Sequence, residues 1–339
     1  MNTDTTEQGE TVLEDSAEND EQQDSSSEPP EDSGEEEPPE PMIVRFIAMG
    51  DGGEGNEAQA TNSLAIESIC NSKTDTQPGC DFVLYMGDNF YDEGVDSVTD
   101  PQFQTKFEAP YNNLSIPFMV ALGNHDYGGC LFGSCGIGWD FDLSQYQVQY
   151  SALSDKWTMP SEYYTFINDH VQFFALDTNA IMWDPWLNTA GLQPNWIRNE
   201  TAASTSQWKI AFGHHPYISN GRHGNAGAYE GLDFLENVAD VPIGTAVKEF
   251  MDEYICGKMD VYLCGHDHNR QWLEPTCGTE FIVSGAAAKT TDLDDKGNPT
   301  KYEDDTTVGF IWIEINDNCL TGEFYDKTEQ LNYTHSLCK

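Results

Sequence analysis

The sequence predicts a layered α/β fold, and three observations favour this fold class. Short apolar runs rich in Val, Ile, Phe and Tyr recur from residue 42 onward, as expected of buried strands. Several of these runs end abruptly in Gly followed by a polar residue. Helix-like segments lie between them, and strands that alternate with helices indicate an α/β arrangement. Because the sequence shows no internal repeat and no second core, we expect one folded domain.

The expected elements follow one another along the chain in a regular order. Five strands with a Gly-polar end are expected over 43–49, 82–86, 118–122, 210–212 and 261–264. Helices are expected over 57–70, 194–203 and 245–256. Strands without such an end are expected over 163–167, 171–176 and 281–284, and an antiparallel pair over 310–315 and 322–325.

Residues 1–41 differ in composition from the rest of the chain. They contain 16 Asp or Glu, no Lys or Arg, and no aromatic residue. Such a segment buries too little apolar surface to offset the entropy lost on ordering, so we expect a disordered acidic tail or spacer. Residues 42–339 are then the folded domain.

The charge of the chain excludes several classes of partner. The net charge is −44, and removing the −16 of residues 1–41 leaves −28 on the rest. Nucleic acid and anionic membranes need basic patches, so neither is expected to bind. The absence of an 18-residue apolar stretch excludes direct membrane insertion. An acidic loop could bind calcium but lacks the ligand spacing of an EF-hand; its residues are Asp292, Asp294, Asp295, Glu303, Asp304 and Asp305.

Nine cysteines indicate an oxidising compartment. We expect a secreted, periplasmic or cell-surface protein whose leader has been removed from the chain as given. Short loops suggest the pairs Cys70–Cys80 and Cys130–Cys135, while an odd count leaves at least one free thiol. Cys264 is the candidate, because it lies inside an apolar strand.

The residues that follow the five strand ends suit a site for two metal ions. In open α/β sheets, sites form at the carboxyl ends of strands. A single Gly-Asp or Gly-His is more often part of a turn, but five such ends that all offer Asp, Asn or His are hard to explain by turns. Carboxylates and imidazoles suit iron, manganese and zinc, and two adjacent cations can clamp the oxygens of a phosphoryl displacement.

Five motifs in order resemble the purple acid phosphatases, closest to the small tartrate-resistant type, within the calcineurin-like metallophosphoesterases. The resemblance spans about residues 43–325 and implies a β-sandwich flanked by helices (αββα). The motifs are Asp-x-Gly at 51–53, Gly-Asp-x-x-Tyr at 87–91, Gly-Asn-His-Asp at 123–126, a Val-x-x-His variant with Ala at 211–214, and Gly-His-x-His at 265–268.

The resemblance also implies a role for each of these residues. One set would hold Fe(III): Asp51, Asp88, Tyr91 and His268. Asp88 would bridge to a second divalent metal, which Asn124, His214 and His266 would complete; iron, zinc and manganese remain open for it. Only a strongly polarising cation would keep the phenolate of Tyr91 ionised at low pH, because a free phenol has a pKa of about 10.

His125 and His223 are implied to face the substrate as acid groups rather than as metal ligands. The expected function is hydrolysis of small-molecule phosphate monoesters by in-line attack of metal-bound hydroxide; the oligomeric state stays open. Two alternatives remain: a phosphodiesterase or nucleotide pyrophosphatase of the same superfamily, and a non-catalytic surface protein that binds metal or ligand. Besides Ala211, two departures from the family pattern stand out. The run Gly52-Gly53-Glu54-Gly55 after Asp51 lacks the aromatic residue often seen there, which could alter the pocket wall. The Gly-rich insert 128–138 could form a lid or a specificity loop.

Overall fold

The structure is a computed structural model that describes residues 41–131, 134–230 and 244–339. The expected acidic tail therefore lies outside the described residues, apart from its last residue. Pro41–Lys339 forms one compact unit. Within the described part of the chain, no helix combines the length and apolarity needed to cross a membrane.

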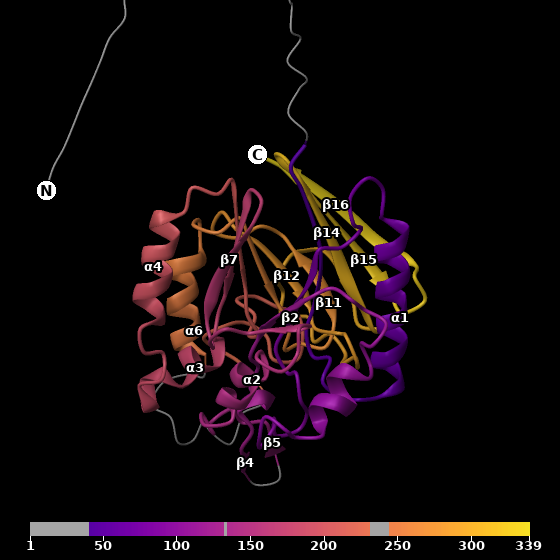
Figure 1. The fold of residues 1–339 in the computed structure, drawn as a ribbon. Helices are drawn as coiled ribbons and strands as arrows, with labels where there is room; N and C mark the ends of the chain where they lie inside the picture. Colours follow the sequence, from indigo (N-terminus) through magenta and orange to yellow (C-terminus); the bar gives the residue numbers. More distant parts are fainter. Residues whose placement is uncertain (1–40, 132–133, 231–243) are drawn as a thin grey trace, which may run out of the picture. The chain divides into compact units, whose positions relative to one another are not determined.

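Two seven-stranded sheets form the centre of this unit (Figure 1). In the first sheet, β1, β2, β3 and β6 run parallel, and β14, β15 and β16 continue antiparallel from the other side of β1. The strand order is β16-β15-β14-β1-β2-β3-β6. The strands span Ile43–Met49 (β1), Phe82–Met86 (β2), Phe118–Ala121 (β3), Trp157–Thr158 (β6), Gly309–Asn316 (β14), Cys319–Asp326 (β15) and Leu331–Cys338 (β16).

The second sheet has a parallel centre and antiparallel edges. Strands β8, β9, β10 and β12 run parallel, in the order β13-β11-β12-β10-β9-β8-β7. A separate short hairpin joins Cys130–Leu131 (β4) to Ser134–Cys135 (β5). The strands of the second sheet span Tyr164–Asn168 (β7), Val171–Ala175 (β8), Trp208–Phe212 (β9), Val261–Cys264 (β10), Arg270–Leu273 (β11), Glu280–Ser284 (β12) and Thr300–Asp304 (β13).

Helices α1, α3, α4 and α6 flank the two sheets on their outer faces (Figure 1). Helix α1 lies beside the first sheet and begins after Asn56, whose side chain accepts a hydrogen bond from the backbone N–H of Gln59. Helices α3, α4 and α6 lie beside the second sheet. The expected αββα sandwich is therefore confirmed. The helices span Glu57–Ser72 (α1), Ser144–Tyr150 (α2), Thr178–Leu187 (α3), Gln193–Ala203 (α4) and Thr245–Phe250 (α6), with π-helical turns at Phe103–Glu108 (η1) and Met251–Ile255 (η3) and a 3₁₀ turn at His125–Tyr127 (η2).

The core has two layers, one on each face of the second sheet. Successive side chains of strand β8 point alternately into one layer and the other. Phe173 points between the sheets, where its ring packs edge-on against Phe46 and Phe82 at centroid distances of 5.3 and 5.2 Å. The neighbouring Phe174 points the other way, into an apolar cluster with Ile181 of α3 and Val247 of α6. Both faces of the second sheet are thus buried, which explains why its parallel strands read as continuous apolar runs.

Every strand and helix expected from the sequence is present, with bounds that differ by at most a few residues. The segment expected as one helix over 245–256 is α6 followed by the π-helical turn η3. Within the described part of the chain, ten further elements were not expected from the sequence: η1, η2, α2, α3, β4, β5, β6, β11, β13 and β16. Strand β16 lies at the edge of the sheet and has mostly polar, exposed or half-buried side chains, so it lacks the apolar run of a buried strand. Helix α3 contains Pro185, which is unusual inside a helix.

Candidate functional site

The loops after β1, β2, β3, β9 and β10 meet at one edge of the two sheets. Parallel strands end on the same side, so the polar residues after them converge. The chain segments after β1 and β10 approach each other closely at glycines: a Cβ placed on Gly50 would lie 3.1 Å from the Cα of Gly265. A carboxylate joins the same loops, since Asp51 accepts a hydrogen bond of 2.8 Å from the backbone N–H of His266.

Three residues at this edge hold a strained backbone conformation. Asp51, Asp88 and His266 have φ angles of 63°, 54° and 70°. Residues other than glycine rarely adopt this left-handed backbone conformation, which costs on the order of 1–3 kcal/mol at each position. Strain of this kind clusters at functional sites, where the direction of a side chain matters more than local stability.

The first group of donor atoms forms around the hydroxyl of Tyr91. Its oxygen lies 2.9 Å from Asp51 Oδ1 and 3.2 Å from His268 Nε2, and His268 Nε2 lies 3.4 Å from the same carboxylate oxygen. Each of Asp51, Asp88 and His268 offers an atom within 4.8 Å of the others. Burial, together with the charges of Asp51 and Asp88, raises the pKa of Tyr91 well above its ordinary value.

The second group forms around Nε2 of His214. Asn124 Oδ1 and His266 Nδ1 each lie 3.1 Å from it, and Asp88 Oδ1 lies 3.3 Å away. The carboxylate of Asp88 therefore stands between the two groups. Burial disfavours the charge of Asp88, yet His214 and His125 hold the pKa of its carboxyl well below the usual range.

The orientation of these groups shows that the site suits cations. His214 Nδ1 lies 2.9 Å from the carbonyl oxygen of Met86, so Nδ1 carries a proton and Nε2 is the ring nitrogen that can bind a metal ion. The amide nitrogen of Asn124 donates to the carbonyl oxygen of Gly136 at 2.6 Å, which turns Oδ1 toward the site. Lone pairs thus converge at separations near 3 Å, which is roughly the spacing of ligands bound at about 2.1 Å and right angles to one metal ion.

The electrostatics around His214 agree with this conclusion. Burial lowers the pKa of this imidazole, but the carboxylates of Asp88 and Asp51 and the carbonyl of Met86 outweigh burial and raise the pKa to about 9. Surroundings that favour a proton on Nε2 also favour a metal cation at that atom.

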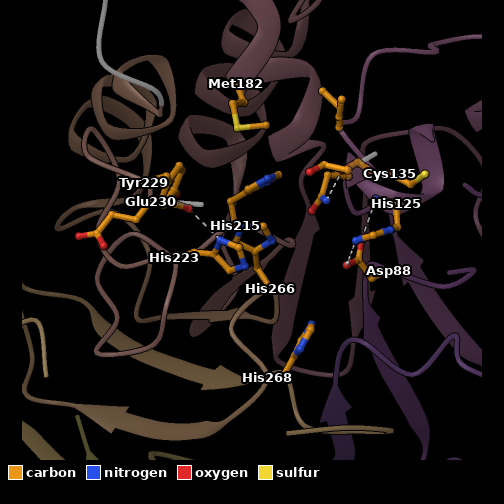
Figure 2. A pocket seen from close by; sticks show the side chains of 14 residues that line it. Asp88, His125, Cys135, Met182, His215, His223, Tyr229, Glu230, His266 and His268 are labelled. Carbon is orange, nitrogen blue, oxygen red and sulfur yellow. Dashed lines mark hydrogen bonds and ion pairs between the residues drawn. The ribbon is translucent and has the colours of Figure 1, made fainter. Parts of the chain in front are cut away.

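The two histidines expected to act as acid groups have matching orientations. His125 Nδ1 lies 2.7 Å from the carbonyl oxygen of Asp92, and His223 Nδ1 lies 3.0 Å from that of Glu230. Each Nδ1 therefore carries a proton, and each ring leaves Nε2 to gain or lose one. Figure 2 shows both side chains in the same pocket, His125 beside Asp88 and His223 beside His266.

The pocket is lined by side chains that can bind metal ions, together with other polar and apolar residues. Part of the wall comes from the insert 128–138, of which residues 132 and 133 lie outside the described part. The disulfide Cys130–Cys135 closes the β4–β5 hairpin, and Gly136 approaches His125 so closely that a Cβ there would lie 2.1 Å from Nδ1. The lining residues are Asp88, Asn124, His125, Ser134, Cys135, Gly136, Ile137, Met182, His215, His223, Tyr229, Glu230, His266 and His268.

The chain matches the family model of the calcineurin-like phosphoesterases over residues 44–270. The protein belongs to the calcineurin-like phosphoesterase family. The matched range includes every residue of the two donor groups. Membership implies a metal centre with two ions, and the donor set of this calcineurin-like phosphoesterase fits such a centre. Membership also places the protein among the phosphoesterases as a class, whereas the ester that it cleaves has to be argued from the site.

Sequence relatives of this phosphoesterase include acid phosphatases. Tartrate-resistant acid phosphatase type 5 of Sus scrofa is 31% identical over 72% of this chain and 69% of its own length. The Homo sapiens protein of the same name is 28% identical over 82% of this chain and 86% of its own length. Purple acid phosphatase 3 of Arabidopsis thaliana is 27% identical over 84% and 74%, respectively.

Solved structures share the fold of the phosphoesterase at lower identity. GAP50, described as the anchor in the inner membrane complex of Plasmodium, has a TM-score of 0.66 at 20% identity, over 88% of this chain and 89% of that chain. A purple acid phosphatase from yellow lupin (Lupinus luteus) seeds has a TM-score of 0.59 at 17% identity, over 87% of this chain and 54% of that chain. These likenesses establish the fold alone, so the function depends on the site.

Two carboxylates that organise the phosphoesterase site had no role in the sequence interpretation. Asp126 is buried and accepts hydrogen bonds from the backbone N–H groups of Gly123 and Asn89 at 2.7 and 2.9 Å, which ties the loops after β2 and β3 together. Asp267 is equally buried and binds the loop that carries His223. Their positions inside the Gly-Asn-His-Asp and Gly-His-x-His motifs were the available signal.

The departure at Gly52 concerns the core rather than the pocket. A Cβ on Gly52 would lie 2.5 Å from the hydroxyl oxygen of Tyr85 and 2.7 Å from that of Tyr111. These two buried tyrosines fill the space that a side chain at position 52 would need. Gly52 does not line the pocket described above.

The cysteines of the phosphoesterase form four disulfides. The expected pairs Cys70–Cys80 and Cys130–Cys135 are both present, and Cys264 is free and buried as expected. The remaining pairs are Cys256–Cys277 and Cys319–Cys338. Four disulfides favour an oxidising compartment outside the cytoplasm.

The acidic loop considered for calcium is held by hydrogen bonds and ion pairs instead. Asp304 pairs with Arg270 at 2.5 Å, and Asp294 lies 3.2 Å from Lys296. The side chain of Asp305 accepts a hydrogen bond from the backbone N–H of Leu293. Among the residues that the structure describes, this loop forms no cluster with the spacing of a metal site.

Proposed function

We propose that the protein is an acid phosphatase of the purple type, which hydrolyses phosphate monoesters at a centre of Fe(III) and a second divalent metal. The observation that carries the proposal is the hydroxyl of Tyr91 between Asp51 Oδ1 and His268 Nε2. A buried phenol beside two carboxylates resists ionisation, so a phenolate there requires a strongly polarising cation.

The two donor groups divide the ligands as the family resemblance implies. Asp51, Tyr91 and His268 would hold the ferric ion, and Asp88 would contribute to both ions. Asn124, His214 and His266 would complete the second site, where iron, zinc and manganese all suit an amide oxygen and two imidazoles. When bound, two metal ions polarise the phosphate and lower the pKa of water, so that hydrolysis proceeds near or below neutral pH.

The chain's own residues bind the substrate and move protons around it. His125 and His223 keep Nδ1 on backbone carbonyls, so their Nε2 atoms can bind phosphate oxygens and donate a proton to the leaving alcohol. Water would attack phosphorus on the side opposite the departing oxygen, so that no side chain would form a covalent phosphoenzyme. Imidazoles that donate protons favour activity at acid pH.

Visible absorption of the iron-loaded protein tests the proposal. Wild type should show a broad band in the middle of the visible range, and Tyr91→Phe should lose it while Tyr164→Phe keeps it. Tyr164 is a suitable control because it is also buried and donates to the carbonyl oxygen of Val120, outside the site. A wild-type protein that holds zinc or manganese and shows no band contradicts the ferric assignment.

Substrate comparison separates the monoesterase from its alternatives. p-Nitrophenyl phosphate should be a better substrate than bis(p-nitrophenyl) phosphate. The opposite order would indicate a phosphodiesterase or nucleotide pyrophosphatase. No turnover of any phosphate ester after iron loading would indicate a protein that binds metal or ligand without catalysis.

We propose that the protein is secreted, periplasmic or located at the cell surface. Four disulfides support it, because structural disulfides persist where the surroundings are oxidising. Cell fractionation with an antibody against the protein tests this proposal; recovery only with cytoplasmic markers would contradict it.

A further inference from the structure

A lysine lies directly over the ring of the tyrosine that marks the proposed ferric site. The Nζ atom of Lys289 is 3.3 Å from the ring centroid of Tyr91. Tyr91 itself is 3% exposed, and the Lys289 side chain is 30% exposed, so solvent screens this contact only in part. The face of an aromatic ring attracts a cation, and the attraction grows as water is removed.

The position of Lys289 is fixed by the loop that follows β12. The backbone N–H of Ala287 donates to the carbonyl oxygen of Gly50 at 3.2 Å, directly before Asp51. The side chain of Asn56 donates to the carbonyl oxygen of Ala288 at 3.0 Å. The residue before Lys289 is therefore tied to the start of α1.

A second interaction holds the ammonium group itself. Lys289 Nζ lies 2.5 Å from Glu54 Oε1, and the Glu54 side chain is 27% exposed. Glu54 follows the Asp-x-Gly motif, so one loop supplies both the carboxylate of Asp51 and the partner of Lys289. The ammonium is held between this carboxylate and the ring face.

We propose that Lys289 is a positioning residue for Tyr91, whose ammonium holds the ring in place and weakens the electron donation of its oxygen to the bound metal. The proposal rests on the proposed function, since it takes Tyr91 as a ferric ligand. The physical reason is distance: a positive charge 3.3 Å from the ring would lower the energy of the ring electrons more than that of electrons on a metal ion held beyond the ring by the phenol oxygen. Groups around a ligand tune a metal in this way.

Two consequences follow for the loaded protein. Lowering the energy of the donor electrons widens the gap to the metal, which moves a tyrosinate-to-iron band to shorter wavelength. Weaker donation also makes the ferric ion easier to reduce. Removal of the ammonium should therefore shift the band to longer wavelength and lower the reduction potential.

The experiment compares Lys289→Met, Lys289→Arg and Glu54→Gln with wild type, each loaded with iron, by visible absorption and by redox titration of the band. Lys289→Met should shift the band to longer wavelength and resist reduction, whereas Lys289→Arg should stay close to wild type because it keeps the charge. Glu54→Gln should shift the band to shorter wavelength, because it leaves the ammonium without its counter-charge.

Lys258→Met is the matched control. It also removes a lysine whose Nζ faces an aromatic ring, at 5.7 Å from the centroid of Tyr254, a residue that does not line the pocket. Its band should be unchanged. A band in Lys289→Met with the wild-type wavelength and potential would overturn the proposal for Lys289 while leaving the ferric site intact. The absence of a band from wild type would contradict the proposed function instead.

Discussion

The side chain of Asp267 accepts a hydrogen bond of 2.8 Å from the backbone N–H of His223. Its other carboxylate oxygen accepts one of 2.5 Å from the hydroxyl of Ser219, and a Cβ on Gly221 would lie 2.3 Å from the Asp267 carboxyl carbon. Asp267 lies between His266 and His268 in the chain, and its carboxylate holds the 219–224 loop. The loop that carries His223 is thus bound directly to the segment that carries His266 and His268.

Asp267→Asn should lower kcat about tenfold or more without loss of metal, because an amide nitrogen cannot accept one of the two hydrogen bonds and the His223 loop shifts. Metal analysis and steady-state kinetics measure both effects. Asp260→Asn is the control: Asp260 also accepts a backbone N–H bond, from Lys209 at 2.7 Å, and it does not line the pocket. An equal fall in kcat in both variants would refute a specific link to His223.

His125→Ala should keep the visible band but lose turnover about 100- to 10,000-fold, because in the proposed mechanism its Nε2 acts on the substrate rather than on the metal. Spectra and kinetics on the same preparation check the prediction. A colourless His125→Ala protein would show that the assignment is wrong.

Asp88→Ala should lose metal and activity together. Its carboxylate stands between the two donor groups, 3.3 Å from His214 Nε2, so its removal affects both sites. Elemental analysis after dialysis is the measurement. Retention of two metal ions per chain would exclude a bridging role for Asp88.

Asp177 should make the protein less stable as pH rises from about 4 to 7. Burial raises the pKa of this carboxyl to about 7, against the lowering effect of its hydrogen bonds from Tyr127 and Ala180. In this window the folded chain binds the proton and the unfolded chain does not, so the free energy of unfolding falls by at most about 1.4 kcal/mol per pH unit.

Asp177→Asn removes this group and should flatten the dependence. The measurement is urea unfolding of both proteins at pH 5, 6 and 7. Parallel curves for the two proteins would mean that Asp177 titrates alike in the folded and unfolded states.

Loss of the Cys130–Cys135 disulfide should weaken the second metal site. The hairpin precedes Gly136, whose carbonyl oxygen orients the Asn124 amide. In the double variant Cys130→Ser/Cys135→Ser, we expect the affinity for the second metal to fall about tenfold, as for other groups that orient a ligand. Metal titration followed by calorimetry provides the value.

The control for this prediction is Cys319→Ser/Cys338→Ser. That disulfide joins β15 to the edge strand β16 and is absent from the pocket lining. Its loss should lower stability by about 2 kcal/mol and leave metal affinity unchanged. Equal losses of affinity in both double variants would point to a general effect of unfolding.

The sequence predicts the inner strands well, and the candidate site residues that follow these strands lie together in the structure, for a physical reason. Strands such as β1 and β10 are buried on both faces, so they are apolar throughout and end where Gly and a polar residue begin. Strand β16 and helix α3 lack such patterns, because the first is half exposed and the second contains Pro185.

The orientation of the side chains within the site could not be predicted from the sequence. The proton on His214 Nδ1 depends on Met86, which lies 128 residues away in the chain. The contact of Lys289 with Tyr91 likewise needs the loop after β12 to meet the loop after β2. Nothing local to either residue indicates such a pairing.

The segments after β1 and β10, which belong to different sheets, approach each other at Gly50 and Gly265 beside the site, and this has a consequence for refolding. Tyr91 follows a strand of the first sheet and His268 follows a strand of the second, so neither sheet alone assembles the group around the Tyr91 hydroxyl. A spectroscopic signal from this group should therefore appear only after the sheets have docked. In a refolding time course with metal present, it would report tertiary assembly separately from the secondary structure that circular dichroism follows.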